Sequence, residues 1–330
     1  MQRRGFIALA GCAAIDWPFF ARAQQRGQTR HIAVLMGGLT QGDEGGQAEA
    51  AALETGLKDL GWNPGRNIDI DYRWPGAELD SVRITANEIV STRPDLVITR
   101  STPATAALQH SGLPLVFTLV AADPVSSGFV QSFGHPGGNI TGFTNFQASV
   151  GSKWLELLKE AAPAVSRIAF LFNPQTAPFA EDYVHAAQAV APTLGAAVIA
   201  APCGNAADIE AALAARASEG GGGIIGMTDT FVTEHRALII ENAARYRLPA
   251  VFGVRSVAPN GGMMAYSADY PDIYRRAAGY VDRILKGEKA ADLPVQEPAK
   301  FTLSINLKAV AAMGLTMPST LVTRADEIIE

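Results

Sequence analysis

The chain has 330 residues, of which 48% are hydrophobic and 18% are charged, and it contains only two cysteines. This composition excludes a disordered chain and a disulfide-rich scaffold, and the length suits two domains of ordinary size. The formal net charge of -5 argues against a nucleic-acid partner, because a surface that binds nucleic acid needs an excess of Lys and Arg.

The N-terminal segment has the pattern of a secretory signal peptide. Arg3 and Arg4 precede a short apolar run, and the segment closes on the small-x-small sequence Ala21-Arg22-Ala23. The run is shorter than the ~20 apolar residues that span a bilayer. We therefore expect residues 1–23 to be a signal peptide and the mature protein to be periplasmic. Because Asp16 interrupts the run, an ordinary first helix or a membrane anchor stays open as an alternative.

Two export routes are compatible with this segment. Arg3-Arg4-x-Phe6 resembles a twin-arginine signal, whereas Leu9-Ala10-Gly11-Cys12 matches a lipoprotein cleavage box. The apolar stretch before Cys12 is very short, so lipid attachment at this residue ranks second. Cleavage after Ala23 leaves Cys203 as the single cysteine, which then has no partner for an internal disulfide.

From residue 30 onward, apolar runs of strand length alternate with segments of helical periodicity. In the first half, strands are predicted at 32–36, 68–72, 96–98 and 115–117, and helices at 44–60, 78–92 and from Pro103. In the second half, helices are predicted at 154–161, 179–194, 206–219 and 232–246, and strands at 168–172, 197–200, 223–227 and 250–252. Residues 134–145, which are rich in turn formers, are predicted to cross between the halves.

The segment after residue 253 is too short for a third domain. It contains predicted strands at 263–266 and 301–305 and a predicted helix at 270–286. We expect an α/β fold with two doubly wound, Rossmann-like lobes of parallel sheet and helices on both faces. The N-terminal lobe is assigned residues 30–145 and 254–290, and the C-terminal lobe residues 146–253 and 291–330. A cleft between the lobes follows from this arrangement.

Polar residues and glycines follow the predicted strands, at the edge where open parallel sheets bind ligands. Ser101 and Thr102 precede Pro103 and suit either a ligand carboxylate or an ordinary helix start. Asp229 suits either a ligand ammonium or a helix cap with Thr230. Asp123 is more typical of a structural cap. Other strand-end candidates are Gly38, Thr40, Asn173 and Arg255.

Motifs for catalysis are absent from the sequence. There is no Gly-x-Ser-x-Gly elbow, no phosphate-binding loop and no Gly-x-Gly-x-x-Gly at the first helix. The five histidines lack the spacing of a metal site. No catalytic residue, metal or cofactor is therefore predicted.

Several sequence segments together resemble one family. They are His31–Gly38, Gly56-Leu57-x-x-Leu60-Gly61-Trp62, Gly65-Arg66-Asn67, Arg93-Pro94-Asp95, Asp123-Pro124-Val125, Pro136–Phe143, Lys153–Lys159, Tyr280–Gly287, Asp292–Gln296 and Arg324–Glu327. The chain resembles the substrate-binding proteins of bacterial ABC importers, which have the type I periplasmic-binding fold. More narrowly, it is similar to the group related to tryptophan- and tyrosine-binding receptors.

The resemblance implies two lobes joined by three crossovers, which close on a small solute and deliver it to a membrane permease with its ATPase. The solute would be amino-acid-like, with an aromatic or branched side chain, or a small organic acid. Strand-end contacts carried over from the family are Thr40, Ser101, Thr102, Asn173, Asp229 and Arg255. For an amino acid, Ser101 and Thr102 would hold the carboxylate and Asp229 the ammonium, while Phe252 or Tyr266 would flank the side chain or lie in the core. A monomer is expected. A secreted enzyme and a sensory module on the same fold remain the alternatives.

Overall fold

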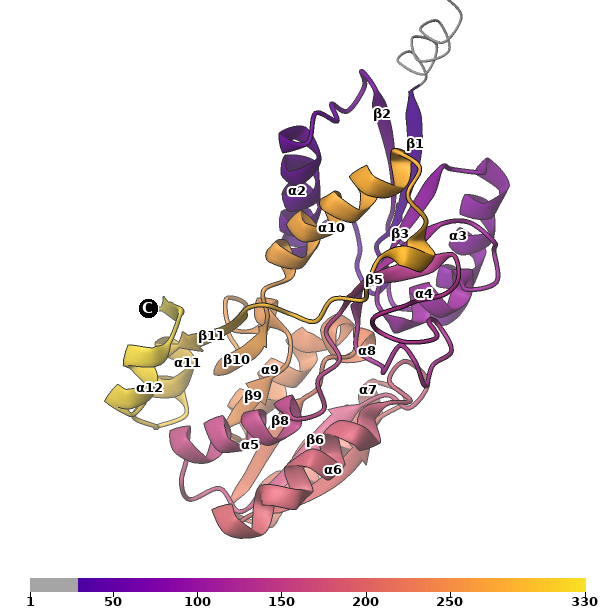
Figure 1. Ribbon diagram of the computed structural model, residues 1–330. Coiled ribbons are helices and arrows are strands. Elements are labelled where there is room, and N and C mark those ends of the chain that lie inside the picture. The colour runs from indigo at the N-terminus through magenta and orange to yellow at the C-terminus, as the bar shows by residue number, and fades with distance from the viewer. Residues whose placement is uncertain (1–28) are drawn as a thin grey trace, which may run out of the picture.

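The N-terminal lobe of the computed structural model, which describes residues 29–330, is built on a five-stranded parallel sheet (Figure 1). The strand order is β2-β1-β3-β4-β5. The strands are β1 (Arg30–Leu35), β2 (Ile68–Arg73), β3 (Leu96–Arg100), β4 (Leu115–Val120) and β5 (Ile140–Thr144). The predicted signal peptide lies outside the described residues.

Helices cover both faces of this sheet. One face carries α2 (Glu44–Asp59) and α10 (Tyr270–Leu285), and the other carries α3 (Leu79–Thr92) and α4 (Thr102–Leu108). Side chains alternate along β1, so Ile32 and Val34 pack with α2 and α10 while Ala33 and Leu35 pack with α3 and α4. A strand that is buried on both faces reads as a continuous apolar run, which is why the sequence predicted it.

The C-terminal lobe has a seven-stranded sheet of order β12-β11-β10-β9-β8-β6-β7. Its strands are β6 (Arg167–Phe172), β7 (Ala197–Pro202), β8 (Gly222–Gly226), β9 (Ala250–Phe252), β10 (Met264–Ala268), β11 (Phe301–Asn306) and β12 (Glu327–Ile329). Strands β10 and β11 pair antiparallel, while the other neighbours pair parallel. The predicted α/β fold with two lobes is confirmed, and this one antiparallel pair departs from the expected all-parallel pattern.

Helices also cover both faces of the second sheet. One face carries α5 (Val150–Ala161), α6 (Ala180–Val190), α11 (Leu307–Ala312) and α12 (Ser319–Arg324). The other carries α7 (Ala206–Ser218), α8 (Thr230–Glu234) and α9 (Arg236–Arg245). The predicted helix 232–246 is thus two helices that meet at His235.

Three segments connect the two lobes, and their positions differ from the expected boundaries. Residues 140–144 form the edge strand β5 rather than a crossover, and the chain passes to the C-terminal lobe between β5 and α5. It returns at Asp269, after β10 has paired with β9 and β11, and not at residue 253. It crosses a third time after Gln296, because a bridge between Phe143 and Gln296 keeps that segment on the N-terminal lobe.

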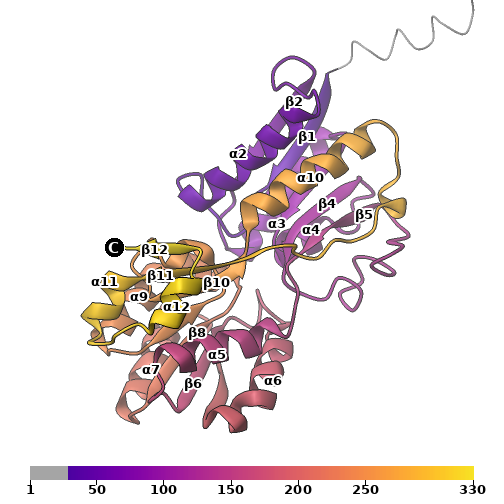
Figure 2. The same ribbon diagram turned by 60° about the vertical axis from the view of Figure 1, so that its left-hand side comes forward.

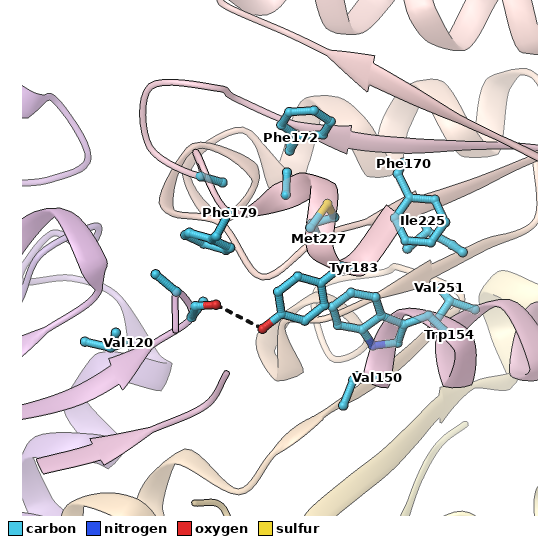
Figure 3. Packing of buried hydrophobic residues seen from close by; sticks show 14 of the residues in the cluster. Val120, Val150, Trp154, Phe170, Phe172, Phe179, Tyr183, Ile225, Met227 and Val251 are labelled. Carbon is cyan, nitrogen blue, oxygen red and sulfur yellow. Dashed lines mark hydrogen bonds between the residues drawn. The ribbon is translucent and has the colours of Figure 1, made fainter. Parts of the chain in front are cut away.

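An aromatic cluster of the C-terminal lobe contacts the N-terminal lobe through the hydroxyl of Tyr183. The Trp154 and Tyr183 rings stack with their centroids 5.6 Å apart, and Phe179 meets Tyr183 edge-on. The Tyr183 hydroxyl donates a hydrogen bond of 3.1 Å to the carbonyl of Ala121, in the loop after β4 (Figure 3). Figure 2 shows the two lobes from the side, with α10 placed on the upper lobe although β10 and β11 belong to the lower one.

Candidate ligand-binding cleft

A small cavity of about 30 Å³ lies between the lobes, at the carboxyl ends of strands from both sheets. The N-terminal lobe contributes residues 100–103, at the junction of β3 and α4, together with Ala121. The C-terminal lobe contributes Thr176, Phe179 and residues 228–230, at the junction of β8 and α8. This is the position at which open α/β sheets bind ligands.

Three buried side-chain oxygens that line the cavity have no hydrogen-bond partner among the described residues. They are Ser101 Oγ in the N-terminal lobe, Asn145 Oδ1 at the first crossing and Thr230 Oγ1 in the C-terminal lobe. A buried polar group without a partner costs ~1–3 kcal/mol, and native proteins rarely leave such groups unpaired. Their convergence on one cavity indicates that this cavity receives a polar ligand.

The backbone of Ser101, which lines this cavity, is strained. Ser101 has φ 83° and ψ 158°, a region that glycine occupies and other residues avoid. Such a conformation costs on the order of 1–3 kcal/mol and persists where the surroundings enforce it. Here the Ser101 amide donates to Thr118 O on β4 at 3.1 Å. The strained backbone holds the Ser101 side chain at the cavity.

Asp229 provides a buried carboxylate on the side of the cavity that the C-terminal lobe forms. Its oxygens accept hydrogen bonds from the Asn173 amide at 2.8 Å, the Thr176 hydroxyl at 2.5 Å and the Phe231 amide at 3.1 Å. Burial raises the pKa of Asp229 to about 6, although these hydrogen bonds act in the opposite direction. Within residues 29–330 no cationic side chain forms a salt bridge with it. Asp229 therefore caps α8 and also brings to the cavity a hydrogen-bonded carboxylate that has no cationic partner among the described residues.

Arg100 provides a buried cation on the opposite side of the cavity, which the N-terminal lobe forms. Its Nε donates to Glu49 Oε2 at 2.8 Å, its Nη2 to Glu49 Oε1 at 3.3 Å and its Nη1 to Gly37 O at 3.1 Å. Burial raises the pKa of Glu49, and the adjacent guanidinium opposes that effect. The cavity thus lies between a cation of one lobe and an anion of the other.

Four of the residues predicted from strand ends line this cavity, namely Ser101, Thr102, Asp229 and Thr230. Thr102 Oγ1 accepts from the amides of Ala121 and Ala122 at 3.2 and 3.4 Å, so its hydroxyl proton remains available to a ligand. Neighbouring cavities between the lobes contain the predicted residues Gly38, Thr40 and Arg255.

The other four predicted residues lie outside the lining of the cavity. Asp123 Oδ1 accepts from the Val125 amide at 2.8 Å and caps a turn. Asn173 contributes its backbone amide to Asp229, while its Oδ1 accepts from the Gln175 amide. Phe252 is buried in the core, and the Tyr266 ring stacks on Phe301 with centroids 5.4 Å apart. These side chains serve local structure.

Sequence reasoning missed several residues that line the cavity, among them Arg100, Asn145, Thr176, Phe179 and Tyr270. A charged residue at the end of the apolar run 96–99 was a usable signal for Arg100. Asn145 and Tyr270 flank two of the crossings, whose positions depend on how the strands pair. Among residues 29–330, no cluster of three or more His, Cys, Asp or Glu side chains suits a metal, and no helix is long and apolar enough to cross a membrane.

Comparisons with known proteins agree with this architecture. The chain is 23% identical over 283 residues to a tyrosine-binding protein of Clostridioides difficile, with 82% of this chain and 79% of that protein covered. A conserved domain protein from Vibrio cholerae has a crystal structure of TM-score 0.83 and 28% identity, over 91% of this chain and 100% of that one. An ABC domain from Streptococcus pneumonia in complex with L-Trp has TM-score 0.81 and 21% identity, over 92% and 100%.

These solved structures confirm the type I periplasmic-binding fold expected from the sequence. The model of the family described as "ABC transporter substrate binding protein" matches residues 43–329. Substrate-binding proteins of this family bind small solutes outside the cytoplasm and work with ABC permeases. The chain belongs to the ABC transporter substrate-binding protein family.

Proposed function

We propose that this protein binds an α-amino acid in the cavity between its lobes and delivers it to the permease of an ABC importer. One observation carries the proposal: within residues 29–330 the buried carboxylate of Asp229 has no cationic partner, and it lies at the cavity with the oxygens of Ser101 and Thr230, which also lack partners there. An ammonium group would compensate the charge of Asp229, and the hydroxyls of Ser101 and Thr102 would donate to a carboxylate. The tyrosine- and tryptophan-binding relatives support this class of ligand.

Binding requires the lobes to move. A water molecule needs about 10–15 Å³ of such space, so the 30 Å³ cavity is too small for an amino acid as it stands. The ligand would enter with the lobes apart and the lobes would close on it, with the three connecting segments as the hinge. In the closed arrangement the Tyr183 hydroxyl donates a hydrogen bond to the Ala121 carbonyl across the lobes.

The ligand class is tested by calorimetry with a panel of amino acids, aromatic acids and short organic acids, and by mass spectrometry of small molecules that co-purify. Asp229→Asn should weaken an amino acid by about 30-fold or more, because it removes one partner of a buried charge pair. Asp123→Asn is the matched control, since this turn-capping carboxylate lies outside the cavity. Tight binding of the deaminated acid, or equal affinities in the Asp229→Asn and wild-type proteins, would exclude an ammonium site at Asp229.

We further propose that the protein acts in the periplasm, exported by residues 1–23. The mass of the protein recovered from the periplasm should correspond to a chain that begins at Gln24. A lipid-modified chain that begins at Cys12 would instead support the lipoprotein route, and an uncleaved chain in the cytoplasm would contradict export.

A further inference from the structure

Arg100 has hydrogen-bond donors left over after its contacts within the protein. The residue is 6% exposed and reaches the cavity from the carboxyl end of β3. A guanidinium has five N–H groups, and three of them meet Glu49 and Gly37 among the described residues. The other two, on Nη1 and Nη2, have no acceptor in that part of the chain. Buried N–H groups normally have a hydrogen-bond acceptor.

Glu49 fixes the orientation of this guanidinium. It lies on α2, is 2% exposed, and binds Arg100 through both of its carboxylate oxygens. The Gly37 carbonyl holds the Nη1 end, and the guanidinium carbon lies 5.9 Å from the centre of the Tyr270 ring. Because these contacts fix the planar guanidinium, its remaining N–H donors keep a fixed direction. Such donors suit a planar acceptor with two oxygens, such as a carboxylate.

A purely structural role explains the pair poorly. Burying two charges costs free energy that their mutual attraction repays only in part, and buried ion pairs often stabilise a fold no better than apolar residues. The pair lies beside the cavity, and the next residue along the chain, Ser101, is strained and has an unpartnered hydroxyl. Both residues line the same cavity, and both have donors without an acceptor among the described residues.

We propose that Arg100 binds the carboxylate of the ligand, together with the Ser101 hydroxyl, and that Glu49 is the positioning residue for Arg100. The inference rests on the proposed function and extends it. The carboxylate then lies against the N-terminal lobe and the ammonium against Asp229 of the C-terminal lobe. A ligand that carries both groups connects the two lobes, whereas a ligand that lacks either group leaves a buried charge of one lobe unmatched.

The test compares an amino acid that binds with its carboxamide, which keeps the ammonium and the side chain but has no negative charge. The wild-type protein should prefer the acid by about 30-fold or more, the cost of removing one partner of a buried charge pair. In the double variant Glu49→Gln/Arg100→Gln, which replaces the ion pair by two neutral amides, this ratio of affinities should fall to within about threefold of unity. Glu49→Gln alone should give an intermediate ratio, because Arg100 stays but loses its fixed orientation.

Arg236→Gln is the matched control. Arg236 also pairs with a carboxylate of the N-terminal lobe, Asp43 at 2.9 Å, but it does not line the cavity. The Arg236→Gln substitution should change the affinities for the acid and the carboxamide by the same factor. A structural role for Arg100 predicts the same equal change, so the ratio separates the two roles.

Two results would overturn the inference. One is equal affinity of the wild-type protein for acid and carboxamide, which needs no variant and therefore decides the matter even where the double variant does not fold. The other is an unchanged ratio in the double variant, which removes the cation altogether. If Asp229→Asn still weakens amino-acid binding by about 30-fold or more in that case, the proposed function stands and only the role of Arg100 is lost.

Discussion

Acidification should weaken amino-acid binding at the cleft, because Asp229 must be ionised to attract an ammonium group. Burial raises the pKa of this carboxyl from 3.8 to about 6, so below pH 6 the ligand-free protein holds a proton there that binding must displace. Each pH unit below the pKa costs about 1.4 kcal/mol, a factor of ten. Between pH 8 and pH 5 the dissociation constant should therefore rise about tenfold.

Isothermal titration calorimetry between pH 5 and pH 8 measures this effect. In two buffers of different ionisation enthalpy, binding at pH 5 should release close to one proton. All five histidines lie among the described residues, and none lines the cavity. Tyr270 lines it with a pKa of about 12 and does not titrate in this range.

A second carboxyl, that of Glu49, contacts the cavity residue Arg100, and its pKa is also raised. The Glu49→Gln variant measures its share of the pH effect. Asp229→Asn should flatten the profile. A dissociation constant that is constant from pH 5 to pH 8, or a full slope that survives in Asp229→Asn, would refute the reasoning.

Three further substitutions test closure and the core. Gly38→Ala should hinder closure, because a Cβ at this position, where φ is +85°, would lie 2.5 Å from Thr230 Cγ2 of the other lobe. The affinity for the ligand should fall at least about tenfold. An unchanged affinity would contradict the close approach of Gly38 and Thr230. Arg236→Gln removes the ion pair with Asp43 between the lobes and should speed ligand dissociation about fivefold in stopped-flow experiments, equivalent to ~1 kcal/mol. Trp154→Ala should destabilise the fold by about 3–5 kcal/mol in urea denaturation, since this side chain is 1% exposed; a loss below about 1 kcal/mol would show that the site collapses around the cavity.

The strands that are buried on both faces were predictable from sequence because each is a continuous apolar run. Strand β5 was missed because Gly142 and its threonine neighbours look like turn formers. In the structure Gly142 serves packing, since a Cβ there would lie 2.1 Å from the Phe117 carbonyl of the adjacent strand. One sequence cannot distinguish a glycine required by a neighbouring strand from a glycine required by a turn.

The candidate site was predictable where it follows directly from strand ends. Ser101 and Asp229 each follow a predicted strand, and both line the cavity. Asn145 and Tyr270 reach it from the crossings, and their location depends on sheet pairings far apart in the chain. Arg100 ends the apolar run 96–99, which was a usable signal, but its burial depends on Glu49, a partner 51 residues away in the sequence.

The exchange of segments between the lobes has a consequence for folding. Helix α10 covers one face of the N-terminal sheet through Tyr274, Ala277 and Val281, yet the chain reaches it only after β6 to β10 of the other lobe. During synthesis, only α2 covers that face of the N-terminal sheet until most of the chain has been made. Neither lobe is a continuous piece of sequence, so a fragment that ends before residue 270 should expose apolar surface and aggregate, and the two lobes should unfold in one cooperative transition.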